Sequence, residues 1–105
     1  MDVKKLKELL SLLPVITVGT VAKDGEIIEG NEDGAHYKIT KERTKKFSDI
    51  EFYILSVSGP ADCRQRLINC FIEILGSPLD RYQTKALPGI DFICWNAKEI
   101  DKKAV

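Results

Sequence analysis

The alternation of apolar and polar residues is clearest between residues 50 and 76, where a strand pattern changes into a helix pattern. In residues 50–57, β-branched and aromatic side chains occupy both alternating faces, which is typical of an interior strand covered on at least one side. After Ser58 and Gly59, Pro60 suits the first turn of a helix, because its missing N–H has no partner there. The sequence therefore predicts a central strand followed directly by a helix that ends at Gly76.

This predicted helix has one broad apolar side. Its apolar residues recur at steps of three and four, and the adjoining isoleucines widen the face. The members of the apolar side are Cys63, Leu67, Ile68, Cys70, Phe71, Ile72, Ile74 and Leu75. The polar side consists of Arg64, Gln65, Arg66, Asn69 and Glu73. We therefore expect the helix to pack on a sheet through the first set.

A shorter helix is predicted at the start of the chain, capped by Asp2 and ending before Pro14. Its apolar residues follow a spacing of three, four and three: Val3, Leu6, Leu10 and Leu13. Leu9 and Leu12 widen the apolar side beyond a narrow seam. Either they pack on the sheet, or they contact a partner protein.

A hairpin is predicted at Asp24-Gly25, which stands between the strand patterns of residues 15–22 and 26–29. In the register that this turn would set, Lys23 faces Glu26 and apolar residues face each other.

The next residues, 30–34, are polar and are predicted to form a flexible connection. Its acidic residues Glu32 and Asp33 are candidate contacts for a partner. They lack the spacing and the closing glutamate of a calcium loop, so no metal site is predicted there.

A third strand is predicted over residues 35–40, with Tyr37 and Ile39 on one face. The charged run 41–46 that follows predicts a hairpin with a long loop before the central strand. The basic residues of this region are candidate partner contacts: Lys38, Lys41, Arg43, Lys45 and Lys46. They form either a solvated loop tip or a site for phosphate or an acidic partner. No aromatic residues alternate with them to stack on bases, so nucleic acid is not an expected partner.

Residues 77–88 are polar and mixed, and are predicted as a long return loop in which Leu79, Tyr82 and Leu87 are possible anchors on the core. A last strand is predicted over residues 90–95, and the charged tail 97–105 is expected to fray. The predicted fold is a single α+β domain over residues 1–105. Its mainly antiparallel sheet has about five strands packed by two helices, in the order α-β-β-β-β-α-β.

Composition narrows the class of protein further. The chain has 105 residues, the size of one domain, and its 16 basic residues balance 16 acidic ones. This balance does not favour non-specific binding to nucleic acid or to an anionic membrane. No apolar run approaches the roughly 20 residues of a membrane span. The start does not resemble a signal peptide, and the three cysteines suit reduced thiols, so we expect a cytoplasmic protein.

The residues that could carry chemistry are few and scattered. Cys63 and Cys70 lie on one predicted helix about 10 Å apart along its axis, too far to share a zinc ion. Cys63 is in the first turn, where a thiol pKa can be lowered, but a nucleophile also needs a base. His36 is the sole histidine and has no acidic residue next to it in sequence. We therefore expect no catalytic residue, no metal and no cofactor.

The order of elements resembles the small tail-terminator and head-tail completion proteins of tailed bacteriophages. The resemblance is carried by the leading helix of residues 3–14, by the strand and helix of residues 50–76, and by the closing strand of residues 89–95. It implies a non-enzymatic protein that works by assembly, as a ring at the end of a tail tube. Leu9, Leu12 and the edge strands would then contact neighbouring copies, in the host cytoplasm or in the virion.

Two other classes of function stay open at this stage. The first is a small inhibitor or immunity protein, encoded by a phage or mobile element, that binds a host defence or toxin protein through its acidic or basic loop. The second is a small ligand-binding domain or enzyme with a pocket between helix and sheet. For the assembly protein and for the inhibitor the expected partner is protein, either another copy of the chain or a different protein.

Overall fold

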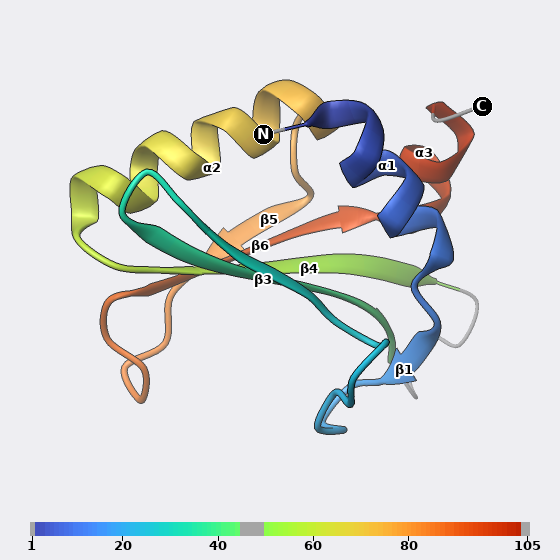
Figure 1. Cartoon of the computed structure of the whole chain (residues 1–105). Helices are drawn as coiled ribbons and strands as arrows, with labels where there is room; N and C mark the ends of the chain where they lie inside the picture. Colours follow the sequence, from blue (N-terminus) through green and yellow to red (C-terminus); the bar gives the residue numbers. More distant parts are fainter. Residues whose placement is uncertain (1, 45–49, 104–105) are drawn as a thin grey trace.

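The helices of the described chain all lie on one face of a single sheet (Figure 1). The computed structural model describes residues 2–44 and 50–103. The helices of these residues are α1 (Val3–Leu12), α2 (Ala61–Leu75) and α3 (Ala97–Lys103). The strands are β1 (Val15–Thr17), β2 (Ile28–Glu32), β3 (Ala35–Arg43), β4 (Glu51–Ser58), β5 (Asp80–Tyr82) and β6 (Ile90–Asn96). The predicted α+β class with a mainly antiparallel sheet is confirmed.

The strand order is β1-β3-β4-β6-β5, so β4 is the central strand, as predicted. β3 is long enough to pair with two strands on its outer edge. β2 pairs antiparallel with residues 35–39 of β3, and β1 pairs parallel with residues 41–43. The remaining pairs are antiparallel. Within the described residues, β1 and β5 are therefore the two ends of the strand order.

The hairpin predicted at Asp24-Gly25 is wrong. These residues do form a tight turn, in which the Glu26 N–H donates to the Lys23 carbonyl at 2.9 Å, but no strand ladder flanks it. The hairpin that forms joins β2 to β3 through Asp33-Gly34, whose φ angles of 50° and 82° are those of the tight turn that suits twisted strands. Because the hairpin turn lies at Asp33-Gly34, residues 30–32 belong to the strand β2 and do not form the predicted flexible connection.

The core lies between the helices and the sheet. From the sheet, β4 contributes Tyr53, Leu55 and Val57 to it. From α2, the buried residues are Leu67, Ile68, Phe71 and Leu75. The predicted apolar side of α2 is thus largely confirmed, with one exception, because Cys70 is exposed.

The C-terminal third differs from the prediction in three ways. β5 occupies part of the predicted return loop and pairs with β6. Leu79, Tyr82 and Leu87 are exposed, so the prediction that they anchor the loop in the core is wrong. The tail does not fray from residue 97, because residues 97–103 form α3 and bury Ala97 and Ile100. Residues 97–103 are too short and too highly charged to show a helical pattern in the sequence. The contacts that bury Ala97 and Ile100 form only in the folded domain.

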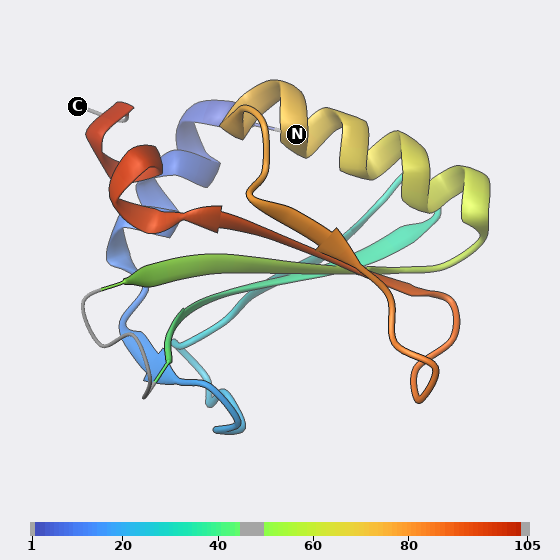
Figure 2. The same cartoon turned by 180° about the vertical axis from the view of Figure 1, so that it is seen from behind.

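The opposite face of the sheet carries no helix. Figures 1 and 2 show that the loops of residues 18–27 and 83–89 both project on this side. The half-buried side chains on this face include Phe52, Ile54 and Phe92. No helix in the described part of the chain has the length and apolar character that a membrane span requires.

Candidate functional site

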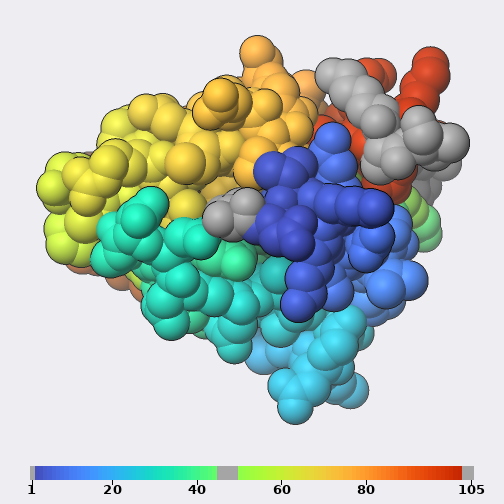
Figure 3. Space-filling view, turned by 45° about the horizontal axis from the view of Figure 1, so that its top comes forward, coloured from blue at the N-terminus to red at the C-terminus, as the bar shows by residue number. Residues whose placement is uncertain are grey.

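Exposed apolar side chains gather at the two ends of the strand order. Ten large apolar residues are exposed among the described residues. Five lie within residues 9–21, on α1, β1 and the loop after it, and we call them the β1-side patch: Leu9, Leu12, Val15, Val18 and Val21. Three lie on β5 or on the segments before and after it, and we call them the β5-side patch: Leu79, Tyr82 and Leu87. Figure 3 shows that residues 9–21, in blue, form one side of the molecule.

The leucines of the β1-side patch are positioned by the register of α1. Asp2 caps the helix by accepting a hydrogen bond from the Lys5 N–H at 3.1 Å. Leu6 and Leu10 then point into the core. Leu9 and Leu12 lie on the outer flank, and Leu12 is 77% exposed. The structure therefore leaves both candidate contact residues of α1 accessible, and packing on the sheet does not account for them.

β5 is held in place by a buried carboxylate. The Asp91 side chain, on β6, is only 4% exposed and lies on the same side of the sheet as α2. Arg64 Nε of α2 donates to its Oδ2 at 3.0 Å, and Gln83 Nε2 donates to its Oδ1 at 2.7 Å. Arg81 of β5 lies 3.6 Å from Oδ2. The prediction that Arg64 is on the polar, solvent-facing side of α2 is therefore wrong. Its partner could have been identified from the sequence, because Asp91 is the one acidic residue in an otherwise apolar strand.

A small hollow lies beside the start of β5, between α2, α3 and the sheet. Its volume is about 120 Å³, and its apolar lining includes Leu75, Leu79, Trp95 and Ile100. Ser77, Asn96 and Glu99 complete its rim. We call it the β5-side pocket.

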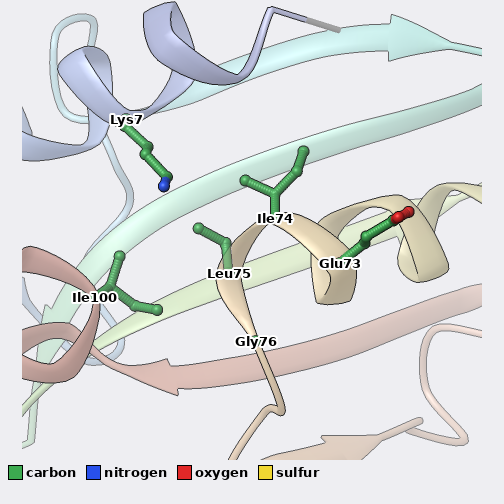
Figure 4. A pocket seen from close by; sticks show the side chains of 6 residues that line it. All are labelled: Lys7, Glu73, Ile74, Leu75, Gly76 and Ile100. Atoms are coloured by element: carbon green, nitrogen blue, oxygen red, sulfur yellow. The ribbon is translucent and has the colours of Figure 1, made fainter. Parts of the chain in front are cut away.

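A second hollow lies where the three helices meet, with a volume of about 210 Å³. Figure 4 shows Lys7 reaching down from α1 toward Ile74, Leu75 and Ile100, while Glu73 points away. Its lining combines one cation with aliphatic side chains, and it is open to solvent on one side.

The described members of the predicted basic cluster do not gather on one surface. Lys41 is directed to the helix side, where its Nζ lies 3.2 Å from Asp101 and 3.9 Å from Glu51. Arg43 is also paired with Glu51. Lys38 is exposed on the helix-free face, because alternate residues of a strand point to opposite faces. Lys45 and Lys46 lie outside the described residues.

The predicted acidic contacts are close in sequence but differ in setting. Asp33 is exposed at the tip of the β2–β3 hairpin. Glu32 is half-buried in β2 and lines a depression of about 280 Å³ together with Leu9 and Tyr37. The structure thus brings together two candidate contact residues, Leu9 and Glu32, that are far apart in the chain.

The chemistry-bearing residues do not converge in the described part of the chain, where no group of three or more His, Cys, Asp and Glu side chains is arranged to hold a metal ion. His36 does have an acidic neighbour, since pairing with β2 places Glu29 Oε2 3.3 Å from its Nε2 and Asn31 Oδ1 3.0 Å from its Nδ1. Burial raises the pKa of the Cys94 thiol, which keeps it protonated near neutral pH.

Comparison with protein families, with curated proteins and with solved structures finds no match to this chain.

Proposed function

We propose that this protein is a non-enzymatic assembly module whose copies join through opposite ends of the sheet. The observation that supports this is the placement of eight of the ten exposed large apolar side chains of residues 2–44 and 50–103 in the β1-side and β5-side patches. Exposed apolar side chains grouped on one part of a small domain mark interaction sites more often than isolated ones do. Edge strands add unpaired backbone groups at the same two places.

The two patches differ in their residues, so a contact between them joins different surfaces of two copies. Such a head-to-tail contact leaves one free patch at each end of a row of copies. Further copies can therefore add until the rotation between neighbours closes a ring. The strand directions are compatible with it. β1 and β3 run in the same direction as β6, because β4 is antiparallel to both β3 and β6. β5 runs opposite to β6, so β5 and the β1 of a neighbour in the same orientation are antiparallel. Antiparallel pairing is the more common and slightly more stable kind.

The ring that we propose is of the kind formed by phage tail-terminator subunits, which the order of elements resembles. In this proposal Leu9 and Leu12 contact a neighbouring copy, and neither a cofactor nor a metal takes part.

Sedimentation velocity and light scattering over micromolar to millimolar concentrations test the proposal. We expect the wild-type chain to form one defined oligomer larger than a dimer. The double variant Val15→Asp/Val18→Asp places charge in the β1-side patch and should be monomeric. Val3→Asp is the matched control, because Val3 is an exposed valine outside both patches, and it should assemble normally. A wild-type chain that stays monomeric throughout would refute self-assembly.

A second function, that of a small inhibitor that binds a different protein, is favoured by the helix-free face of the sheet. An open face of an antiparallel sheet is usually polar, yet this one carries Phe52, Ile54, Phe92 and Cys94. A partner that covered this face would bury them. The same sedimentation experiment separates the two functions, since an inhibitor is expected to remain a monomer or dimer at every concentration.

A further inference from the structure

We propose that Leu12 of one copy inserts into the β5-side pocket of the next copy, so that α1 is the inserting element and the α2–α3–β5 corner is the receptor. The inference rests on the proposed self-assembly and names the contact that would produce it. It is carried by three observations on the described residues: the size and lining of the pocket, the position of Leu12 relative to α3, and the charges around each surface.

The pocket suits an aliphatic side chain. A dry cavity of roughly 150 Å³ lined by aliphatic and aromatic residues admits a six-carbon ring. The β5-side pocket, at about 120 Å³, is therefore large enough for the four-carbon side chain of leucine. Its wall is fixed, because Trp95 Nε1 donates to the Gly76 carbonyl at 2.9 Å and the Trp95 side chain is buried. Leu79, which is 60% exposed, stands at its mouth and would be covered by the incoming helix.

Leu12 and the pocket lie at the same level of the molecule. α3 contributes Ile100 and Glu99 to the pocket. It is also tied to the C-terminal end of α1, since the Tyr53 hydroxyl lies 2.6 Å from Asp101 Oδ1 and 3.0 Å from the Leu10 carbonyl oxygen. The C-terminal end of α1 and the helix α3 are thus on the same side of the sheet, at the end where β6 runs into α3 (Figures 1 and 2). A neighbour displaced across the strands, from the β5 end, presents its α1 at the level of the pocket.

Each surface carries one charged side chain that can pair with the other, Lys5 on α1 and Glu99 at the pocket. α1 carries three lysines and one glutamate, and none of the lysines has an ion-pair partner among the described residues. Lys5 lies seven residues before Leu12 and therefore on the same side of the helix. The pocket rim includes Glu99, whose carboxylate likewise has no ion-pair partner in residues 2–44 and 50–103. Opposite potentials across a contact favour the correct partner and its correct register.

The test uses two full-length variants, each of which lacks one half of the contact. Leu12→Asp removes the inserting side chain and leaves the pocket intact, whereas Leu79→Asp places a charge at the pocket mouth and leaves α1 intact. Both positions are exposed, so both variants should fold, and circular dichroism checks this. We expect each variant alone to be monomeric. Mixed in equal amounts, they should form a one-to-one heterodimer and nothing larger, because only one intact contact can form.

The possible results separate this inference from the function it rests on. A wild-type chain that remains monomeric overturns the proposed function. A wild-type oligomer that neither variant disrupts leaves self-assembly standing and overturns the Leu12 contact. Disruption by only one of the two variants overturns it as well; a symmetric contact between two α1 helices, for example, would be lost in Leu12→Asp and kept in Leu79→Asp. Disruption by both variants without heterodimer formation also overturns it.

A charge exchange provides an independent readout. Lys5→Glu and Glu99→Lys should each raise the dissociation constant of the contact by about tenfold, equivalent to about 1.4 kcal/mol. The double variant should recover most of the wild-type affinity, and failure to recover it would contradict the proposed pairing.

Discussion

Phe71 and Cys70 are adjacent in α2, yet Phe71 is fully buried and Cys70 is exposed. The ring of Phe71 packs edge-on against Tyr37 of β3, with the ring centroids 5.2 Å apart. The helical period predicts that both residues lie on the apolar side of α2. That predicted side is broad, since it also includes Ile68 and Ile72. The sheet contacts only part of that width, and Cys70 falls outside it.

This difference gives a direct test of the core. Phe71→Ala removes a fully buried ring and should lower the free energy of unfolding by roughly 3–5 kcal/mol. Cys70→Ala is the matched control, and should change it by less than about 0.5 kcal/mol because an exposed side chain loses few contacts. Urea unfolding followed by circular dichroism measures both. Equal effects of the two substitutions would show that the face of α2 is wrongly placed.

Among the elements, α3 shows how a helix can depend on its surroundings. Its apolar contribution is small, but a polar network also fixes it to the sheet. Asp101 accepts from Lys41 Nζ at 3.2 Å and lies 2.6 Å from the Tyr53 hydroxyl. Tyr53 is buried, and this burial together with the neighbouring carboxylate of Asp101 raises the pKa of its hydroxyl well above the ordinary value.

Tyr53→Phe tests this network through its dependence on pH. Loss of a hydrogen bond to a charged acceptor should cost about 1.5–3 kcal/mol of unfolding free energy near neutral pH. The pKa of Tyr53 is higher in the folded than in the unfolded chain, so its contribution is complete below about pH 10 and is lost as the pH rises further. The difference between wild type and variant should therefore shrink above about pH 10. Chemical unfolding at pH 7, 9 and 11 measures it, and a constant difference would contradict the assignment.

For the molecule as a whole, net charge and local charge lead to different expectations. The formal net charge is zero, so no overall field drives association. Lys5 of α1 and Glu99 at the β5-side pocket nevertheless carry opposite charges, which would give the proposed head-to-tail contact an attractive electrostatic component. That component acts between exposed groups and is sensitive to salt.

Salt should therefore weaken assembly. Raising NaCl from about 0.1 M to about 1 M shortens the screening length from about 10 Å to about 3 Å, and the dissociation constant should rise several-fold. The double variant Lys5→Gln/Glu99→Gln, which lacks one pair of these charges, should show a smaller change. Sedimentation at each salt concentration measures both chains. Assembly that strengthens with salt would indicate an apolar contact without the proposed charge pairing.

Local patterns in the sequence were enough to predict several parts of this structure. The strand and helix over residues 51–75, the capped first helix, the last strand and the α+β class follow from periodicity and from capping and terminating residues. These features depend on interactions between residues that are close in the chain, so the sequence alone determines them. The exposed pair Leu9 and Leu12 was also identifiable, because two leucines exceed what the inner face of α1 requires.

The tertiary structure decided what depends on distant partners. Of two Asp-Gly turns, only Asp33-Gly34 joins paired strands, since β3 accepts β1 and β2 on one edge and leaves residues 18–27 outside the ladder. Lys41 is neutralised by residues that follow it by 10 and by 60 positions in the chain. Likewise the two exposed patches lie at opposite ends of one sheet, because strand order, which no local pattern encodes, separates β1 from β5.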